Sequence, residues 1–293
     1  MRRRHTSERE QLDLFRALPG DLAARDAQDL MAYPFFSLAK SKRIVPIDFR
    51  TGKITIRVEA LPEHGMATIW DADVLIWAAS QIVEARDAGL KTSRLMAATP
   101  YEMLTFVGRG TSARDYDRLK AGLDRLQSTT VMTSIRQPTE RRRHRFSWIN
   151  EWKETADPHG RPLGLELILP DWFYAGVLDE ALVLTIDRAY FDLTGGLERW
   201  LYRLVRKHGG RQDGGWSFDL KHLHAKSGCL SPLKHFAYDV REIVRRETLP
   251  GYRLVLERGL RGTERLNFTP IPVDPLAAAL RRRGLATASG EKL

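Results

Sequence analysis

Apolar side chains recur every three or four positions in several stretches of the chain, a spacing that predicts amphipathic helices. In the first half, residues 73–88 carry such a stripe, which a glycine ends. A shorter helix is predicted to begin at Pro100, because a capping threonine precedes it, and to end in the glycine-rich turn at 108–110. Thr111 or Ser112 then caps a longer amphipathic helix. A short helix, a tight turn and a longer helix form the helix-turn-helix pattern.

Alternating apolar and polar positions predict strands around these helices. Residues 54–58 alternate in this way, and residues 163–169 form a further apolar strand. Residues 129–135 are rich in β-branched side chains and residues 146–152 form a returning strand, with a polar hairpin at 137–145 between them. A helix-turn-helix followed by a hairpin predicts a winged helix, with the arginine-rich tip of that hairpin as its wing.

The second half repeats this order of elements about 120 residues later, so that Gly228 takes the place of Gly108. Its expected helices and strands lie at 197–207, 216–218, 220–225, 231–244, 252–256 and 266–269. We interpret this order as an internal structural repeat. It predicts an α+β fold built from two tandem winged-helix (helix-turn-helix) domains.

The same pattern divides the chain into four parts. We expect an N-terminal arm over residues 1–50, a first winged-helix domain over 51–178, a second over 179–270, and a peripheral or disordered tail over 271–293.

Composition adds a preference for a polyanionic partner. The 293 residues include 47 lysines and arginines against 37 aspartates and glutamates, a formal net charge of +10. A single cysteine, Cys229, excludes an intramolecular disulfide framework and fits a reducing cytoplasm. No apolar run approaches the length of about 18 residues that a membrane helix requires, so we expect a cytoplasmic protein with no membrane contact.

Polar and basic residues near the start of each longer helix are the candidates for DNA contact, because recognition helices insert that half into the major groove. In the first unit these are Arg109, Thr111, Ser112, Arg114 and Arg118. The expected wing adds Arg141, Arg142, Arg143, His144 and Arg145. In the second unit they are Lys226, Ser231, Lys234, His235 and Arg241. The alternative for each set is a solvated helix face or a solubilising charge run.

Enzyme-like patterns are weaker. Residues 108–113 fit a glycine-rich dinucleotide fingerprint, but they follow a helix and not the strand that this motif needs. His222 and His224 lie two apart, so on a helix they point to different sides and do not form a metal pair. Asp71 and Asp73 stand at a helix start, where free amides explain them. We expect no catalytic residue, metal site or cofactor.

Several longer stretches resemble the replication initiator protein A family of plasmids, which is related in plan to two-winged-helix, iteron-binding initiators. They lie at 11–15 (QLDLF), 66–76 (MATIWDADVLI), 184–191 (LTIDRAYF), 197–204 (LERWLYRL), 206–212, 224–228 and 231–234. The resemblance covers roughly residues 11–270. One departure is at 236–239 (FAYD), where the family carries more basic residues, so we expect the first unit to supply more of the phosphate affinity.

The resemblance implies binding to repeated double-stranded DNA sites at a plasmid origin, origin melting, and recruitment of host replication proteins such as an initiator and a helicase. It implies no catalysis, and a homodimer is left open. A winged-helix transcriptional regulator or autorepressor would use the same contacts. A DNA-nicking enzyme would need a tyrosine or clustered carboxylates with a metal, and an RNA-binding or protein-interaction module would show no preference among duplex sequences.

Overall fold

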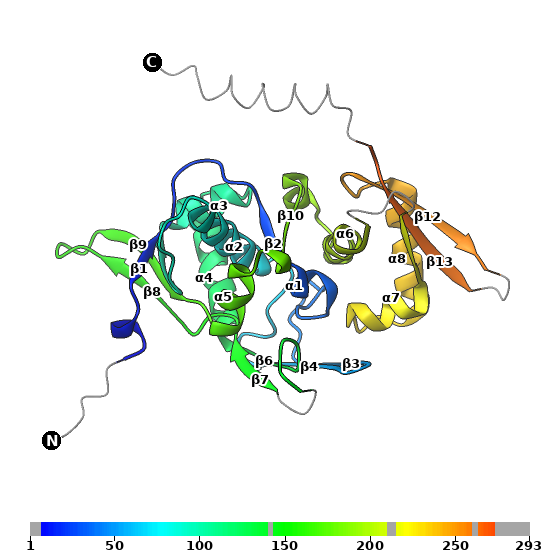
Figure 1. The fold of residues 1–293 in the computed structure, drawn as a ribbon, viewed down its shortest axis with the longest axis horizontal. Helices are drawn as coiled ribbons and strands as arrows, with labels where there is room; N and C mark the ends of the chain where they lie inside the picture. The colour runs from blue at the N-terminus through cyan, green and yellow to red at the C-terminus, as the bar shows by residue number, and fades with distance from the viewer. Residues whose placement is uncertain (1–6, 140–142, 210–214, 260–262, 273–293) are drawn as a thin grey trace, which may run out of the picture.

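The computed structural model describes residues 7–139, 143–209, 215–259 and 263–272, which form a mixed α and β fold (Figure 1). No helix within these ranges is long and apolar enough to cross a membrane. One continuous apolar core connects both halves of the chain, from Phe15 near the start to Phe268 near the end.

Three helices of the first half lie where the apolar spacing predicts them: α2 (Ala72–Asp87), α3 (Pro100–Phe106) and α4 (Ala113–Ser128). A capping box begins α3, because the Glu102 amide donates to the Thr99 hydroxyl (3.1 Å) and the Thr99 amide donates to the Glu102 carboxylate (2.7 Å). Gly108 has φ +68°, a left-handed conformation that favours glycine, and this lets the chain turn from α3 into α4. The first helix-turn-helix arrangement is therefore confirmed.

Two four-stranded sheets accompany these helices. One has the order β3-β4-β6-β7, formed by β3 (Ile47–Thr51), β4 (Ile54–Ala60), β6 (Thr129–Thr133) and β7 (His144–Ser147). The other has the order β1-β5-β9-β8, formed by β1 (Leu14–Arg16), β5 (Leu95–Ala98), β9 (Pro162–Ile168) and β8 (Glu151–Ala156). Strand β5 directly precedes α3 and β6 directly follows α4, so the helix pair is joined to both sheets.

The hairpin predicted as the wing is present, because β6 pairs antiparallel with β7, but its returning strand ends at Ser147. The single strand predicted at 146–152 is two strands in different sheets, β7 and β8. Trp148 and Ile149 between them are both fully buried, which breaks the alternation that a continuous strand would keep. Trp148 lies among the rings of Phe36 and Phe146, with centroids 4.9 and 5.4 Å away. The arginine-rich hairpin β6–β7 therefore pairs with β4, and the hairpin that joins β5 is β8–β9.

The second half repeats the order of the first. It contains α6 (Gly196–Gly209), β11 (Trp216–Asp219), α7 (Leu220–Ser227), α8 (Leu233–Arg246), β12 (Tyr252–Arg258) and β13 (Glu264–Pro270). Gly228, with φ +62°, turns the chain between α7 and α8 as Gly108 does between α3 and α4. The sheet order β11-β13-β12 matches β5-β9-β8, because in both the strand before the helix pair joins the last strand of the hairpin. The order of elements therefore recurs, except that the β6–β7 hairpin after α4 has no counterpart after α8.

The first fifty residues contribute to three sheets and both halves. Strand β1 runs parallel to β5, β3 pairs with β4, and β2 (Arg25–Ala27) pairs antiparallel with β10 (Val183–Thr185). The remaining elements are η1 (Arg9–Gln11), α1 (Gln28–Ala32), α5 (Asp171–Leu178), η2 (Glu180–Leu182) and η3 (Arg188–Asp192). Near the start of the described chain, the 3-10 turn η1 is thus followed directly by strand β1.

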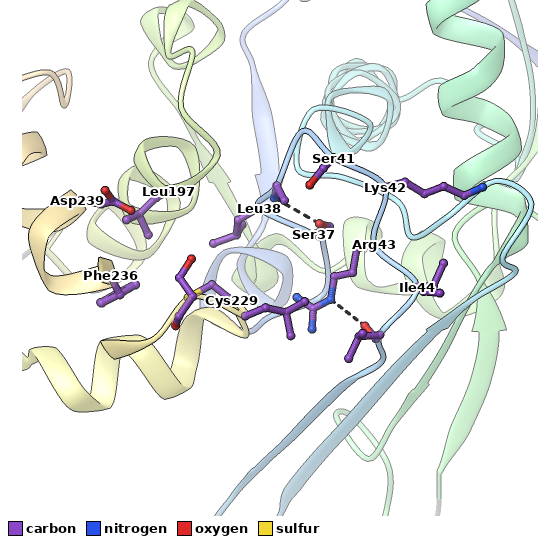
Figure 2. Close-up of a pocket in the computed structure, with 14 residues that line it drawn as sticks. Ser37, Leu38, Ser41, Lys42, Arg43, Ile44, Leu197, Cys229, Phe236 and Asp239 are labelled. Carbon is purple, nitrogen blue, oxygen red and sulfur yellow. Dashed lines mark hydrogen bonds between the residues drawn. The ribbon is translucent and has the colours of Figure 1, made fainter. Parts of the chain in front are cut away.

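The segment after α1 also touches the second helix pair. The guanidinium of Arg43 donates to the carbonyl oxygens of Val45 (2.8 Å) and Gly228 (2.6 Å). Figure 2 shows Arg43 between this segment and the side that carries Cys229. The contact fixes residues 37–45 against the turn between α7 and α8.

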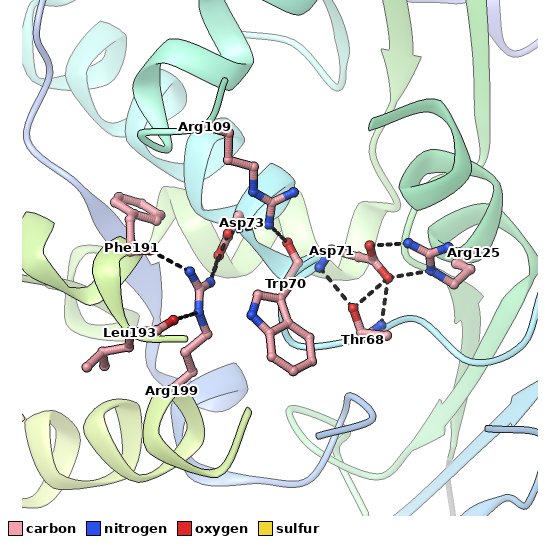
Figure 3. A network of polar contacts seen from close by, with 9 residues as sticks. All are labelled: Thr68, Trp70, Asp71, Asp73, Arg109, Arg125, Phe191, Leu193 and Arg199. Carbon is pink, nitrogen blue, oxygen red and sulfur yellow. Dashed lines mark hydrogen bonds and ion pairs between the residues drawn. The ribbon is translucent and has the colours of Figure 1, made fainter. Parts of the chain in front are cut away.

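Buried ion pairs join the two halves. Arg203 of α6 donates to both carboxylate oxygens of Asp26 (2.6 and 2.9 Å), and both side chains are about 1% exposed. Arg199, one turn earlier on α6, donates to both oxygens of Asp73 on α2 (2.9 Å each; Figure 3). Buried charges of this kind need fully paired partners, so α6 has one compatible position against the first half.

We predict that Arg203→Met lowers the free energy of unfolding by about 3–5 kcal/mol, because it leaves the Asp26 carboxylate buried without a partner. Replacing both residues, as Asp26→Leu with Arg203→Met, should recover most of this loss, since no uncompensated charge remains. Urea denaturation of the single and double variants measures both effects. A double variant no more stable than Arg203→Met would contradict the explanation.

Candidate nucleic-acid interface

The start of α4 presents polar side chains to solvent. Thr111, Ser112 and Arg114 are exposed, and Arg114 has no hydrogen bond or ion pair within the described parts of the chain. The Ser112 hydroxyl donates to the Asp115 carboxylate (2.6 Å), which lowers the pKa of that carboxyl. Arg118 lies 3.3 Å from Asp115 and is 63% exposed, so this ion pair is weak. Four of the five first-unit candidates therefore share one accessible surface.

Arg109 is the exception in this set, because its predicted role as a free cation for DNA does not fit its contacts. Its guanidinium donates to the Trp70 carbonyl oxygen and to the Asp73 carboxylate, both at 2.7 Å (Figure 3). The same carboxylate accepts from Arg199, and burial raises the pKa of Asp73 while the two arginines oppose that shift. Arg109 is thus committed to holding the turn before α4, which makes it a positioning residue and not a free cation.

Asp71 has a similar role that the sequence did not indicate. It was expected to cap α2, but its side chain makes no cap bond there. It accepts instead from Nε and an Nη of Arg125 on α4 (2.8 and 2.7 Å) and from the Thr68 hydroxyl (2.9 Å; Figure 3). The hydrogen bond to Asp71 raises the pKa of Arg125. The pair attaches the last turn of α4 to the start of α2.

Only part of the arginine-rich run at 141–145 lies within the described residues. Arg141 and Arg142 lie outside the described residues. Arg143 and Arg145 are exposed on the β6–β7 hairpin, and Arg145 lies 3.7 Å from Glu59 on β4, across the intervening strand β6. The His144 ring packs edge-on against Phe146 of β7. Arg143 and Arg145 therefore belong to the β6–β7 hairpin and not to the β8–β9 hairpin, which pairs with β5.

The start of α8 resembles the start of α4 in exposure. Ser231, Lys234 and His235 are all exposed. Arg241, two turns further on, is half-exposed and pairs with Glu264 on β13, with Nε 3.2 Å from a carboxylate oxygen. Because Arg241 is paired with a carboxylate, it attracts an anionic ligand less strongly than Lys234 does. Lys234 has no carboxylate partner within the described chain.

The DNA contact predicted for Lys226 does not fit the structure, because this residue is buried. The residue is 8% exposed, and its ammonium lies over the rings of Tyr33 (4.6 Å) and Phe49 (6.0 Å). Burial, together with the charge of Lys207, lowers the pKa of Lys226 to about 8. The residue follows Leu223 by three positions, so helical periodicity already placed it on the apolar face of α7. Lys226 thus packs against Tyr33 and Phe49 inside the protein and is not part of the exposed surface.

His208 lies in the same packed region, at the end of α6. Its ring packs against Phe218 (5.1 Å) and Trp216 (6.3 Å). Burial lowers the pKa of His208 to about 4, and the nearby charges of Lys226 and Lys207 add to the shift. The folded protein therefore holds this histidine neutral at physiological pH.

Sequence comparison identifies the family. The chain matches the family described as replication initiator protein A over residues 25–254. It belongs to this family. It is also 30% identical over 228 residues to a protein of Wigglesworthia glossinidia brevipalpis named "Putative replication protein", covering 76% of this chain and 82% of that protein. Membership gives the chain a role as a replication initiator.

Two solved structures share the fold of this initiator. A crystal structure of selenomethionine derivatives of domains 2 and 3 of RctB matches with a TM-score of 0.58 at 14% identity, covering 80% of this chain and 94% of that chain. A second crystal structure of RctB domains 2–3 matches with a TM-score of 0.54 at 15% identity, covering 87% and 100%. At these identities the likeness concerns the fold alone.

We predict that Lys234→Ala lowers the salt dependence of duplex DNA binding by about one unit in the slope of log K against log salt, whereas Lys226→Met leaves it unchanged. The exposed lysine can release one counterion, and the buried one cannot. Fluorescence anisotropy with duplex DNA flanking the gene of this initiator measures both slopes. An equal loss in the two variants would place Lys226 at the interface.

We also predict that the free energy of unfolding decreases as the pH falls from about 6.5 to about 4. An unfolded histidine titrates near 6.5 and folded His208 near 4, so the unfolded state gains the proton first. The loss at pH 5 should be about 1 kcal/mol, a value reduced because the ring is partly exposed. In urea denaturation at pH 7 and pH 5, His208→Phe should weaken this dependence and the exposed His159→Phe should not. Identical slopes would exclude His208 as the cause.

Proposed function

We propose that this initiator binds repeated double-stranded DNA sites at a plasmid origin through two winged-helix units, promotes melting of the origin and recruits host replication proteins. The observation that carries the proposal is the repeat of one element order, strand, helix, turn, helix and hairpin, in which both longer helices begin with exposed polar and basic side chains. Two linked units fit a ligand that is itself repeated.

The strand orders β5-β9-β8 and β11-β13-β12 support the winged-helix assignment, since β8 contacts α4 and β12 contacts α8, the longer helix of each unit. The wings are then β8–β9 and β12–β13. Exposed cations lie on both, with Arg161 at the turn of the first and Arg258 at the end of β12 in the second. Arginines on a hairpin beside a recognition helix suit the phosphate backbone or the minor groove.

The two units have different charge near their recognition helices. In the first, Arg114 and Arg118 project from α4, and Arg143 and Arg145 stand on the adjacent β6–β7 hairpin. In the second, the corresponding half of α8 carries Lys234 as its exposed full cation. We therefore infer that the first unit contributes more of the salt-dependent affinity. The second unit would then serve more to set the spacing between the bound DNA sites.

The proposal assigns no catalytic step to the chain, and it places the protein with DNA in the cytoplasm.

A transcriptional regulator that represses its own gene is the second candidate, because the same exposed faces of α4 and α8 would serve it. The initiator assignment is favoured by family membership. Nicking of origin DNA by the purified chain with magnesium would overturn the non-enzymatic part of the proposal.

We predict that Arg114→Ala weakens binding to the protected repeats by about 1–3 kcal/mol, because an exposed arginine in the first turn of a recognition helix reaches base edges. DNase footprinting on the DNA flanking the gene gives the affinity, and plasmid copy number gives the consequence. Both should fall together.

The control for this experiment is Lys91→Ala. Lys91 is also exposed, but it lies beyond the far end of α2, a helix of 16 residues and hence about 24 Å long, from the end that approaches α4. It should leave both measurements unchanged. Weakened footprints with an unaltered copy number would favour the autorepressor, and no protected site on wild-type protein would reject the proposal.

A further inference from the structure

One exposed loop lies between the two helix pairs. Its ends are fixed: the Ser37 amide donates to the Ala67 carbonyl (2.9 Å), and the Met66 amide donates to the Arg43 carbonyl (2.7 Å). Between these anchors, residues 39–42 are all exposed. A side chain at Gly65 would place its Cβ 2.7 Å from Cγ of Lys42, so the stem of this lysine packs closely on the turn below. The loop is therefore held in place while its tip faces solvent.

Lys40 faces the first unit. It lines a depression of about 530 Å³ together with Asp115 and Arg118 from the first turns of α4. The other cations in this depression, Arg109 and Arg125, are paired with buried carboxylates. Lys40 approaches only the Trp70 ring (5.6 Å to its centroid), and no carboxylate pairs with it in the described chain. It is a free positive charge beside the start of α4.

Ser41 and Lys42 adjoin the second unit, although the Lys42 ammonium points away from it. They line a depression of about 290 Å³ with Ser231, Phe236 and Asp239, which come from the start of α8. Figure 2 shows this lining, with Cys229 and Phe236 on one side of the loop and Lys42 extending away from them. The Lys42 ammonium donates to the Glu63 carbonyl oxygen (2.6 Å), which leaves its full charge uncompensated. Asp239 is the acid in this lining, and Lys42 is not paired with it.

The loop is short enough for neighbouring residues to lie near both longer helices. Consecutive Cα atoms are 3.8 Å apart, so the Cα atoms of Lys40 and Lys42 are at most about 7 Å from each other. Three residues therefore adjoin the start of both longer helices. Phosphates along one DNA strand follow every 3.4 Å of helix axis, so a loop of this length can lie beside more than one phosphate.

We propose that Lys40, Ser41 and Lys42 form a third DNA-contact site, which binds the phosphate backbone of the duplex where it passes between α4 and α8. The proposal rests on the DNA binding proposed above and adds a site in the segment that sequence analysis treated as an arm. The ligand is a phosphodiester backbone, because the loop offers two ammonium groups and a hydroxyl but no planar fork to read a base edge.

The test compares Lys40→Ala/Lys42→Ala with wild type by fluorescence anisotropy on duplex DNA flanking the gene, between about 0.05 and 0.2 M salt. Loss of two phosphate contacts should reduce the slope of log K against log salt by about 1.8. Each lost contact should also weaken binding about eightfold at 0.1 M salt, if affinity extrapolated to 1 M is unchanged. Lys40→Arg/Lys42→Arg should restore most of the affinity.

Two controls make the result decisive. Lys91→Ala should keep the wild-type slope, and the thermal unfolding midpoint of the loop variant should stay close to wild type, since both lysines are exposed and the variant loses a single hydrogen bond from Lys42 to a carbonyl oxygen. If wild type binds, Arg114→Ala weakens binding and the loop variant behaves as wild type, the third site is rejected and the proposed function stands. Weaker binding with an unchanged salt slope would also reject a phosphate contact. If wild type binds no duplex, both proposals fail.

Discussion

Asp73 is a carboxylate that is 1% exposed, and the arrangement of both helix pairs depends on how it is compensated. A buried carboxylate is costly unless ion pairs and hydrogen bonds replace water. Two guanidinium groups do so: Arg199 brings α6 of the second half against α2, and Arg109 brings the turn before α4 to the same point. One side chain therefore couples the position of the first recognition helix to the placement of the second half.

Local signals predicted most helices of this fold. The capping threonine before Pro100 and the glycines at 108 and 228 act within a few residues, so their effect can be read from sequence without knowing what packs nearby. Strand partners could not be predicted in this way. The parallel pairing of β1 with β5 and the division of residues 146–152 between two sheets depend on contacts with segments far away in the chain.

The same distinction between local and distant contacts separates the interface residues that could be predicted from those that could not. Exposure of Arg114 and Lys234 follows from helical periodicity, because the apolar stripe of each helix determines which side faces solvent. The internal roles of Arg109 and Lys226 depend on Asp73 and Tyr33, which are distant in sequence. Lys226 alone carried a local warning, its place three residues after Leu223. The loop at 40–42 had no periodic signal, since it matters only where folding brings it between two helices.

Net charge gives the sign of the partner but not the site. Several arginines of this chain, among them Arg125, Arg199 and Arg203, are used in pairs with buried carboxylates, and each such pair is close to neutral when seen from outside. The excess positive charge must therefore reside on exposed cations without a carboxylate, such as Arg114 and Lys40. Because paired and unpaired arginines are identical in sequence, only the fold separates those that hold the protein together from those that remain for a polyanion.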